Sequence, residues 1–96
     1  MLGFDWDAAK NAQNARKHGV SFEEARTVFH DEWGVLIEDD DESVGEERLV
    51  LIGMSATLRV LVVSHCYRTR SQVIRLISAR KANREERKAY EARWKR

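Results

Sequence analysis

Arginine, histidine and carboxylate side chains are the groups in this sequence whose positions suggest a shared chemistry. Each candidate lies at the end of a predicted helix or on or beside a predicted strand: His18, Glu47, Arg48, Arg75 and Arg80. Such a set suits cleavage of an RNA phosphodiester without a metal. One group activates the 2′-hydroxyl, another protonates the leaving oxygen, and cations stabilise the charged phosphorane.

His18 follows Lys17 and precedes Gly19 at the predicted end of the first helix. Cations are favoured there because the last carbonyls of a helix carry partial negative charge, so one interpretation is a purely structural cap. The alternative is that His18 acts as a general acid or base, since histidine titrates near neutral pH. Both interpretations stay open, and Lys17 is a candidate RNA-binding cation beside it.

Glu47 and Arg48 precede a predicted strand and so lie at an edge of the sheet. A surface ion pair is one interpretation. The alternative assigns proton transfer to Glu47 and phosphate binding to Arg48, because a guanidinium binds phosphate oxygens bidentately and keeps its charge.

Arg75 and Arg80 lie on the last predicted strand. By the two-residue period of a strand, Arg75 falls in an otherwise apolar row and Arg80 falls on the opposite face. An arginine in an apolar row is costly unless it has a partner or an open surface, which favours a functional role for Arg75. Arg80 and Lys81 end the strand and are predicted to project into a shared anion site. Arg84 is a further candidate RNA-binding residue.

Other catalytic arrangements are missing from the sequence. No two histidines have the i, i+4 spacing of a helical metal site, and the acidic stretch at 38–47 lacks the alternating ligands and glycine of a calcium loop. Neither a glycine-rich phosphate loop nor a nucleophile elbow occurs. The single cysteine, Cys66, excludes an internal disulfide and is expected to be a small buried strand residue. We therefore expect neither a metal nor a cofactor.

Three helices are predicted from capping patterns. Asp5 or Asp7 caps a first helix that Gly19 closes, and Ser21 begins a second helix that runs to about residue 29. Asn83 caps a final helix within 82–96, a segment that carries six bases.

Four apolar runs between these helices predict four strands, at 34–37, 49–52, 58–63 and 73–77. Short links favour antiparallel hairpins, because parallel neighbours need long crossovers. The predicted fold is α+β, with two N-terminal helices, a four-stranded mainly antiparallel sheet and a C-terminal helix. Apolar side chains occur on both faces of this sheet, so the C-terminal helix or a partner protein must cover the face that the N-terminal helices leave open.

The size and charge of the chain limit the classes of protein to consider. Its 96 residues, 43% hydrophobic and 34% charged, predict one globular domain over 1–96. The net charge of +1 hides a segregation, because residues 68–96 hold eleven bases and three acids whereas residues 38–47 hold seven acids. No apolar run is long enough to cross a membrane and no export signal is visible, so we expect a cytoplasmic protein.

Several motifs occur together in one order along the chain. They include Phe4-x-Trp6-Asp7-x-x-Lys10, Lys17-His18-Gly19-Val20-Ser21-Phe22, Glu46-Glu47-Arg48 and Ile77-Ser78-Ala79-Arg80-Lys81-Ala82. On these motifs the sequence resembles the BrnT family of type II toxins over nearly its whole length. The strand ending at Ser64-His65-Cys66-Tyr67 departs from the family pattern, which leaves the role of His65 open.

The resemblance implies a RelE-like fold and a ribonuclease activity that arrests translation. It also implies a BrnA-type antitoxin with a ribbon-helix-helix part, so that operator DNA is contacted only through the toxin-antitoxin complex. The residue types at His18, Glu47, Arg48, Arg75 and Arg80 match polar positions of the family. Two alternatives remain: a nucleic-acid-binding protein without catalysis, and an inactive remnant that still binds an antitoxin.

Overall fold

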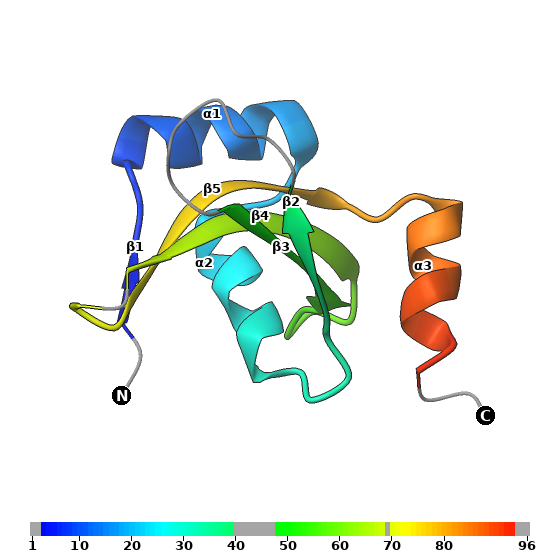
Figure 1. Cartoon of the computed structure of the whole chain (residues 1–96). Coiled ribbons are helices and arrows are strands. Elements are labelled where there is room, and N and C mark those ends of the chain that lie inside the picture. Colours follow the sequence, from blue (N-terminus) through cyan, green and yellow to red (C-terminus); the bar gives the residue numbers. More distant parts are fainter. Residues whose placement is uncertain (1–2, 40–47, 69, 94–96) are drawn as a thin grey trace.

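A computed structural model describes residues 3–39, 48–68 and 70–93 (Figure 1). Its centre is a five-stranded sheet with the order β1-β5-β4-β3-β2. The elements along the chain are β1 (Gly3–Asp5), α1 (Ala8–His18), α2 (Phe22–Ala25), the 3-10 helix η1 (Arg26–His30), β2 (Val35–Asp39), β3 (Arg48–Met54), β4 (Val60–Arg68), β5 (Val73–Lys81) and α3 (Arg84–Glu91). None of these helices is long and apolar enough to cross a membrane.

The predicted helix starts agree with the observed caps, although the strand β1 precedes α1 and takes in Asp5, the other predicted cap. Asp7 accepts a hydrogen bond from the backbone N–H of Lys10 at 3.0 Å, and Gly19 ends α1 in the left-handed conformation at φ 69°. Ser21 caps α2, which continues as η1 through the rest of the predicted helix. Asn83 forms a reciprocal capping box with Glu86 at the start of α3.

The prediction of four strands is wrong by one. The four predicted strands are β2 to β5, which pair antiparallel in sequence order, but the three-residue β1 adds a parallel pairing with β5 in which Asp5 lies opposite Arg75. A three-residue strand is too short to show an alternating pattern, and its partner lies some seventy positions away. The RelE-like part of the expectation stays a prediction.

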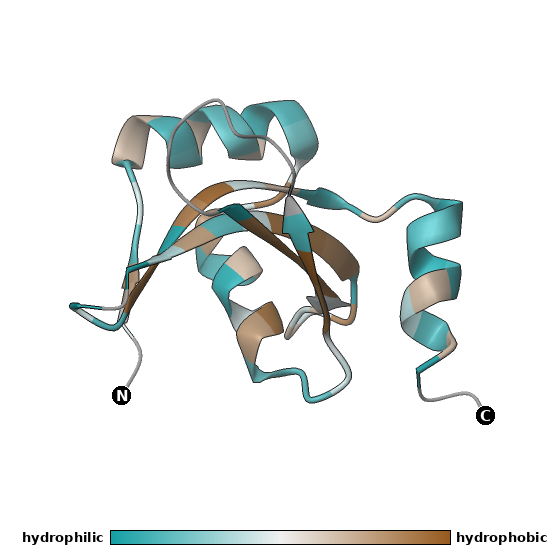
Figure 2. Ribbon diagram, in the orientation of Figure 1, coloured by the Kyte–Doolittle hydropathy of each residue, from teal (hydrophilic) through white to brown (hydrophobic). Residues whose placement is uncertain are grey.

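One face of the sheet, the helix-covered face, packs against α2 and η1 (Figure 1). Phe22 and Val28 from this helical layer are fully buried against Leu61, Val63 and Leu76 from the strands. Figure 2 shows hydrophobic residues along β3, β4 and β5 and mostly hydrophilic ones along α1 and α3. Each such buried side chain contributes about 1.5–3 kcal/mol to stability, so this layer forms the main core.

An irregularity between β4 and β5 changes the direction of the side chains after it. Ser64 pairs with Ser78 and the next residue of β4 pairs with Leu76, so Ile77 is skipped in the register. The bulge restarts the alternation, and Ala79 therefore joins Leu76 in the helix-covered core.

Arg80 consequently lies on the same face as Arg75, which corrects the predicted placement on opposite faces. The prediction assumed an unbroken two-residue period along this strand. One extra residue is enough to reverse every side chain that follows it.

Helix α1 covers the part of the β5 edge that β1 is too short to pair. The buried Asn14 donates from Nδ2 to the Ala79 carbonyl at 2.8 Å and accepts from the Ala79 N–H at 3.1 Å. The same amide donates to the Val20 carbonyl at 2.8 Å. One side chain thus completes both backbone bonds of an edge residue and joins α1 to the sheet.

The turn between β3 and β4 is tied to α2 by the Glu24 carboxylate. Glu24 accepts hydrogen bonds from the hydroxyls of Ser55 at 2.7 Å and Thr57 at 2.5 Å, and from Arg59 Nε at 2.9 Å. Mainly because of the hydrogen bonds from Arg59, the pKa of Glu24 falls to about 2. Its charged form is therefore part of the folded structure.

The opposite face of the sheet, which we call the open face, is covered by α3 at one end and by no other helix of residues 3–39, 48–68 and 70–93. Tyr90 of α3 is buried with Ile52, Val62 and Ala82, and its hydroxyl donates to Asp31 Oδ2 at 2.6 Å. The C-terminal helix therefore provides part of the cover that the sequence required, and the remainder of this face forms a groove beside α3.

Candidate functional site

The open face brings together three of the arginines proposed from the sequence. Its groove has a volume of about 650 Å³ and is walled by β2 to β5 on one side and by α3 on the other. Polar residues at its floor and rim come from β2, β4, β5 and α3: Glu38, Ser64, Ser78, Arg80, Glu85 and Glu86. The groove therefore offers both cationic and hydrogen-bonding groups beside an apolar floor.

Arg48 and Arg75 lie in one row across the sheet, separated by a single strand. Arg48 is opposite Cys66, Cys66 is opposite Arg75, and Arg75 is opposite Asp5. Side chains opposite each other on paired strands lie about 5 Å apart at Cβ, so this row, which we call the arginine row, holds two guanidiniums on one surface. Cys66 is 4% exposed, which confirms the prediction of a buried strand cysteine.

Asp5 fixes the position of Arg75. The Nη1 atom of Arg75 donates to Oδ2 of Asp5 at 2.6 Å, and the side chains of Arg75 and Asp5 are 31% and 44% exposed. The sequence suggested Asp5 only as a helix cap, and no local signal places it beside an arginine seventy residues away. The pairing of β1 with β5 makes the contact.

Arg80 is engaged in a bidentate ion pair with Glu86 of α3. Nη1 and Nη2 of Arg80 donate to the two carboxylate oxygens of Glu86 at 2.7 Å and 2.8 Å. This fork geometry is the one by which arginine also binds a phosphate. Because of the bond from Arg80, the pKa of Glu86 lies below its ordinary value, so the carboxylate is charged at neutral pH.

His18 and Lys17 approach the open face from its β5 edge. They line a groove of about 360 Å³ between α1 and β5, together with Lys10, Gln13, Asn14, Ile77 and Ser78. Ser78 also lines the groove beside α3, so the two hollows meet there. The structure thus places His18 at the border of the open face rather than in the arginine row.

The other sequence candidates have different positions. Lys81 points away from Arg80, because neighbouring strand residues face opposite sides, and lines a separate groove of about 320 Å³ with Arg59 and Arg87. The shared anion site predicted for Arg80 and Lys81 is therefore not formed. Arg84 is exposed in the first turn of α3, and Glu47 lies outside the described residues.

His65 faces the helical layer and not the arginine row. It is 3% exposed, packs edge to face on Phe29 at 4.8 Å between ring centroids, and shares a hydrogen bond at 3.1 Å with the Val63 carbonyl. Burial lowers the pKa of His65, so its ring is neutral at pH 7. Its position indicates a packing role.

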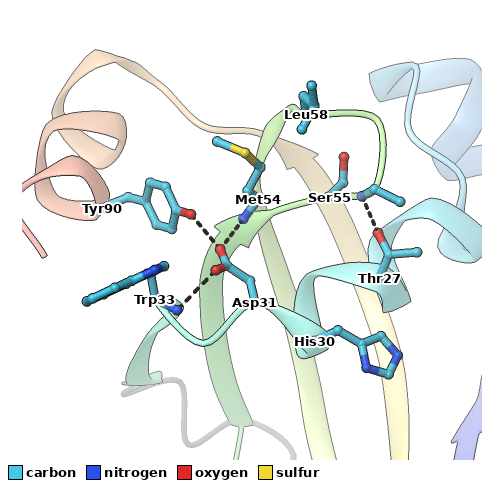
Figure 3. A pocket seen from close by; sticks show the side chains of 9 residues that line it. Thr27, His30, Asp31, Trp33, Met54, Ser55, Leu58 and Tyr90 are labelled. Carbon is cyan, nitrogen blue, oxygen red and sulfur yellow. Dashed lines mark hydrogen bonds between the residues drawn. The ribbon is translucent and has the colours of Figure 1, made fainter. Parts of the chain in front are cut away.

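A second, mostly apolar pocket of about 610 Å³ lies under α3, around Asp31 (Figure 3). Asp31 accepts hydrogen bonds from the hydroxyl of Tyr90 and from the backbone N–H groups of Met54 at 2.8 Å and Trp33 at 3.0 Å. Burial disfavours its charge, but these bonds outweigh it and keep the pKa of Asp31 below its ordinary value. Asp31 thus anchors α3 to the sheet, because its acceptor capacity is used within the fold.

Within the described parts of the chain, no group of three or more histidine, cysteine, aspartate or glutamate side chains is arranged to hold a metal ion. The open face carries the guanidiniums of Arg48, Arg75 and Arg80, and the carboxylates of Asp5 and Glu86 pair with the last two. A guanidinium binds phosphate oxygens and stabilises charge that develops on them.

The fold and the open face together define a small α+β protein with three arginines on one face of its sheet. Residues 6–86 match the model of a family described as the ribonuclease toxin, BrnT, of type II toxin-antitoxin systems, and the chain belongs to this BrnT family. The resemblance inferred from the motifs is confirmed. A toxin of this type implies an antitoxin partner.

The fold is also similar to a solved structure. The crystal structure of the Brucella abortus ribonuclease toxin BrnT superposes with a TM-score of 0.67 at 22% sequence identity, covering 88% of this chain and 100% of that one. Identity at this level supports the shared fold alone. A search of curated protein sequences finds no significant match.

Proposed function

We propose that this toxin cleaves RNA on the open face, without a metal, and that a BrnA-type antitoxin neutralises it. The observation that carries the proposal is the arginine row, in which Arg48 and Arg75 lie on the same face as Arg80. Nucleic acids are recognised first through their phosphates, and arginine is the side chain best suited to a charged phosphorane.

The proposed reaction is attack of a ribose 2′-oxygen on the adjacent phosphorus. A P–O2′ bond forms, the P–O5′ bond breaks, and the products are a 2′,3′-cyclic phosphate and a 5′-hydroxyl. A base removes the 2′-proton and an acid protonates the leaving 5′-oxygen. His18 and Glu47 are the proposed proton-transfer groups, and His18 is supported by the continuity of its groove with the open face at Ser78.

Each arginine has a distinct proposed role. Arg75, oriented by Asp5, and Arg48 stabilise the charge on the non-bridging oxygens of the phosphorane. Arg80 binds a neighbouring phosphate after exchanging its contact with Glu86. Lys17 and Arg84 add binding energy along the RNA strand, whereas Lys81 faces the other side of the sheet and has no proposed contact on the open face. The toxin acts in the cytoplasm, and operator DNA is contacted only through the antitoxin complex.

Cleavage of single-stranded RNA by the purified chain in excess EDTA tests the proposal. Arg48→Ala and Arg75→Ala should each slow cleavage by about 10²–10³-fold, the loss typical of one donor to a charged transition state. Arg16→Ala, at an exposed position of α1, is the matched control and should cleave at the parent rate. Folded arginine variants that also cleave at the parent rate would remove the arginine row from the reaction.

A binding function without catalysis is the second candidate. One observation favours it: of the side chains described in the arginine row, Arg48, Cys66, Arg75 and Asp5, none is a histidine or another group that ordinarily titrates near pH 7. Under this alternative the same assay gives a salt-sensitive mobility shift and intact RNA.

A further inference from the structure

The two edges of the sheet are protected to different degrees. At one edge, β1 pairs with the first part of β5 and Asn14 of α1 completes the backbone bonds of Ala79. At the other edge, β2 pairs with β3 on its inner side, and no other strand of the described ranges pairs with its outer side. An edge of this kind is a template for another strand.

Apolar side chains are exposed on both faces of this edge. Leu36 is 59% exposed and Ile37 is 46% exposed, and as neighbours in a strand they point to opposite faces. An edge strand ordinarily presents at least one polar face to water. Both apolar layers of the sheet therefore extend to β2 and stop there uncovered by the described residues.

Leu36 leads into an apolar groove on the helix-covered face, beyond the part that the helices occupy. This groove, of about 380 Å³, is lined by Phe29, Leu36, Leu49, Leu51, His65, Tyr67 and Ile74. Tyr67 within it is 40% exposed. On the other face, Ile37 and Glu38 line the groove beside α3.

An added strand is the occupant that fits both the unpaired outer edge of β2 and the apolar side chains exposed on its two faces. It would satisfy the outer backbone groups of β2, and its alternating side chains would cover Leu36 on one face and Ile37 on the other. A helix laid on either face would cover one of these residues and leave the backbone edge unpaired.

The negative charge near β2 indicates which residues the added strand should carry. Glu32 and Glu38 are exposed acids beside and on β2, and residues 31–39 contain neither lysine nor arginine. A second copy of the same strand would bring the same acids against them, which is unfavourable, whereas a strand with lysine or arginine beside its apolar residues is complementary.

We propose that β2 accepts an extended segment of the antitoxin, in which apolar residues alternate with basic ones, as a sixth strand of the sheet. The proposal uses the family assignment only for the existence of an antitoxin. It is independent of the RNA chemistry proposed for the arginine row.

Amide hydrogen exchange on this full chain, alone and saturated with the antitoxin encoded beside its own gene, tests the proposal without any substitution. We expect amides within residues 35–39 to be at least tenfold more protected in the complex. Unchanged exchange at β2 in a formed complex would overturn it, as would failure of the neighbouring protein to bind.

Substitutions separate this surface from general apolar contacts. Leu36→Lys and Glu38→Lys should each weaken antitoxin binding at least tenfold, whereas Leu58→Lys, at a residue 77% exposed in the β3–β4 turn, should leave it unchanged. Equal losses from Leu36→Lys and Leu58→Lys would contradict the proposal. If the free chain self-associates and Leu36→Lys abolishes this association, the occupant of the β2 edge is a second copy of the chain, and the proposal is overturned.

RNA cleavage by the free Leu36→Lys variant distinguishes this proposal from the enzymatic one. Leu36 lies on the helix-covered side, away from the arginine row, so the cleavage rate should equal that of the parent. A variant that cleaves RNA and escapes the antitoxin supports the edge as the docking site. A parent that binds antitoxin through β2 but cleaves no RNA refutes only the ribonuclease mechanism.

Discussion

The helix-covered face contributes Leu61, Val63 and Leu76 to a dry core, whereas the open face carries Arg48, Arg75 and Arg80, of which Arg80 lines the groove beside α3. Both sets come from the central strands β3 to β5, and their side chains point to opposite faces of the sheet. Burial of the first set stabilises the fold. The second set adds little to stability, because partly exposed ion pairs are worth about 0–1 kcal/mol, and it is the set that we propose binds RNA.

Truncation of the core should show the largest difference between the two faces. Phe22→Ala on the helix-covered side should lower the free energy of unfolding by about 3–5 kcal/mol, because Phe22 is fully buried and the change leaves a cavity. Ser78→Ala, a small truncation on the open face, is the comparison and should cost less than about 1 kcal/mol. Urea denaturation measures both, and similar losses would contradict the division of roles.

Removing the side-chain amide of Asn14 should cause the next largest loss in the free energy of unfolding. Asn14→Ala removes the partners of the Ala79 N–H, the Ala79 carbonyl and the Val20 carbonyl, so we expect a loss of about 2–3 kcal/mol. Gln13→Ala, at an exposed position one residue earlier, is the control. Faster hydrogen exchange at the Ala79 amide should accompany the loss, and unaltered exchange there would argue against the edge-capping role.

The Glu24 network predicts a pH dependence of stability. The pKa of Glu24 is about 2 in the folded chain and near 4.5 as its ordinary value, so the unfolded chain binds the proton more tightly. Stability from this group is present above about pH 4.5 and is lost as the pH falls toward about 2. We expect a contribution of about 1–2 kcal/mol after screening is allowed for.

Urea denaturation between pH 5 and pH 2 measures this effect. Glu24→Gln should reduce the slope of stability against pH in that range, because the substituted amide does not titrate. A variant with the parent slope would show that other carboxylates carry the acid sensitivity.

Breaking the ion pair between Arg80 and Glu86 on the open face should change the stability least of the substitutions considered. Glu86→Gln weakens the contact that holds Arg80, so RNA should bind about 2–5-fold tighter at low salt while unfolding changes by less than about 1 kcal/mol. A gel-shift titration across salt concentrations measures the affinity. Weaker binding by Glu86→Gln would mean that the tie to α3 shapes the groove and is not a competitor of phosphate.

Much of the secondary structure was predictable because its signals are local. The caps at Asp7, Ser21 and Asn83 each use a side chain and a backbone group three residues apart, and all three are observed. The apolar runs of β2 to β5 likewise report burial through neighbours in sequence. Two arginines of the candidate site, Arg48 and Arg75, followed from their placement on these strands.

The sequence by itself therefore determined the helix starts, four of the five strands, the basic character of the C-terminal third and, through its motifs, the BrnT family. Only the tertiary structure decided that Asp5 forms an ion pair with Arg75 and that a bulge at Ile77 turns Arg80 onto the open face. It also decided that Arg80 pairs there with Glu86. The physical reason is that register, bulges and ion pairs between distant elements depend on which strands meet. Patterns among neighbouring residues do not specify which strands pair or in which register.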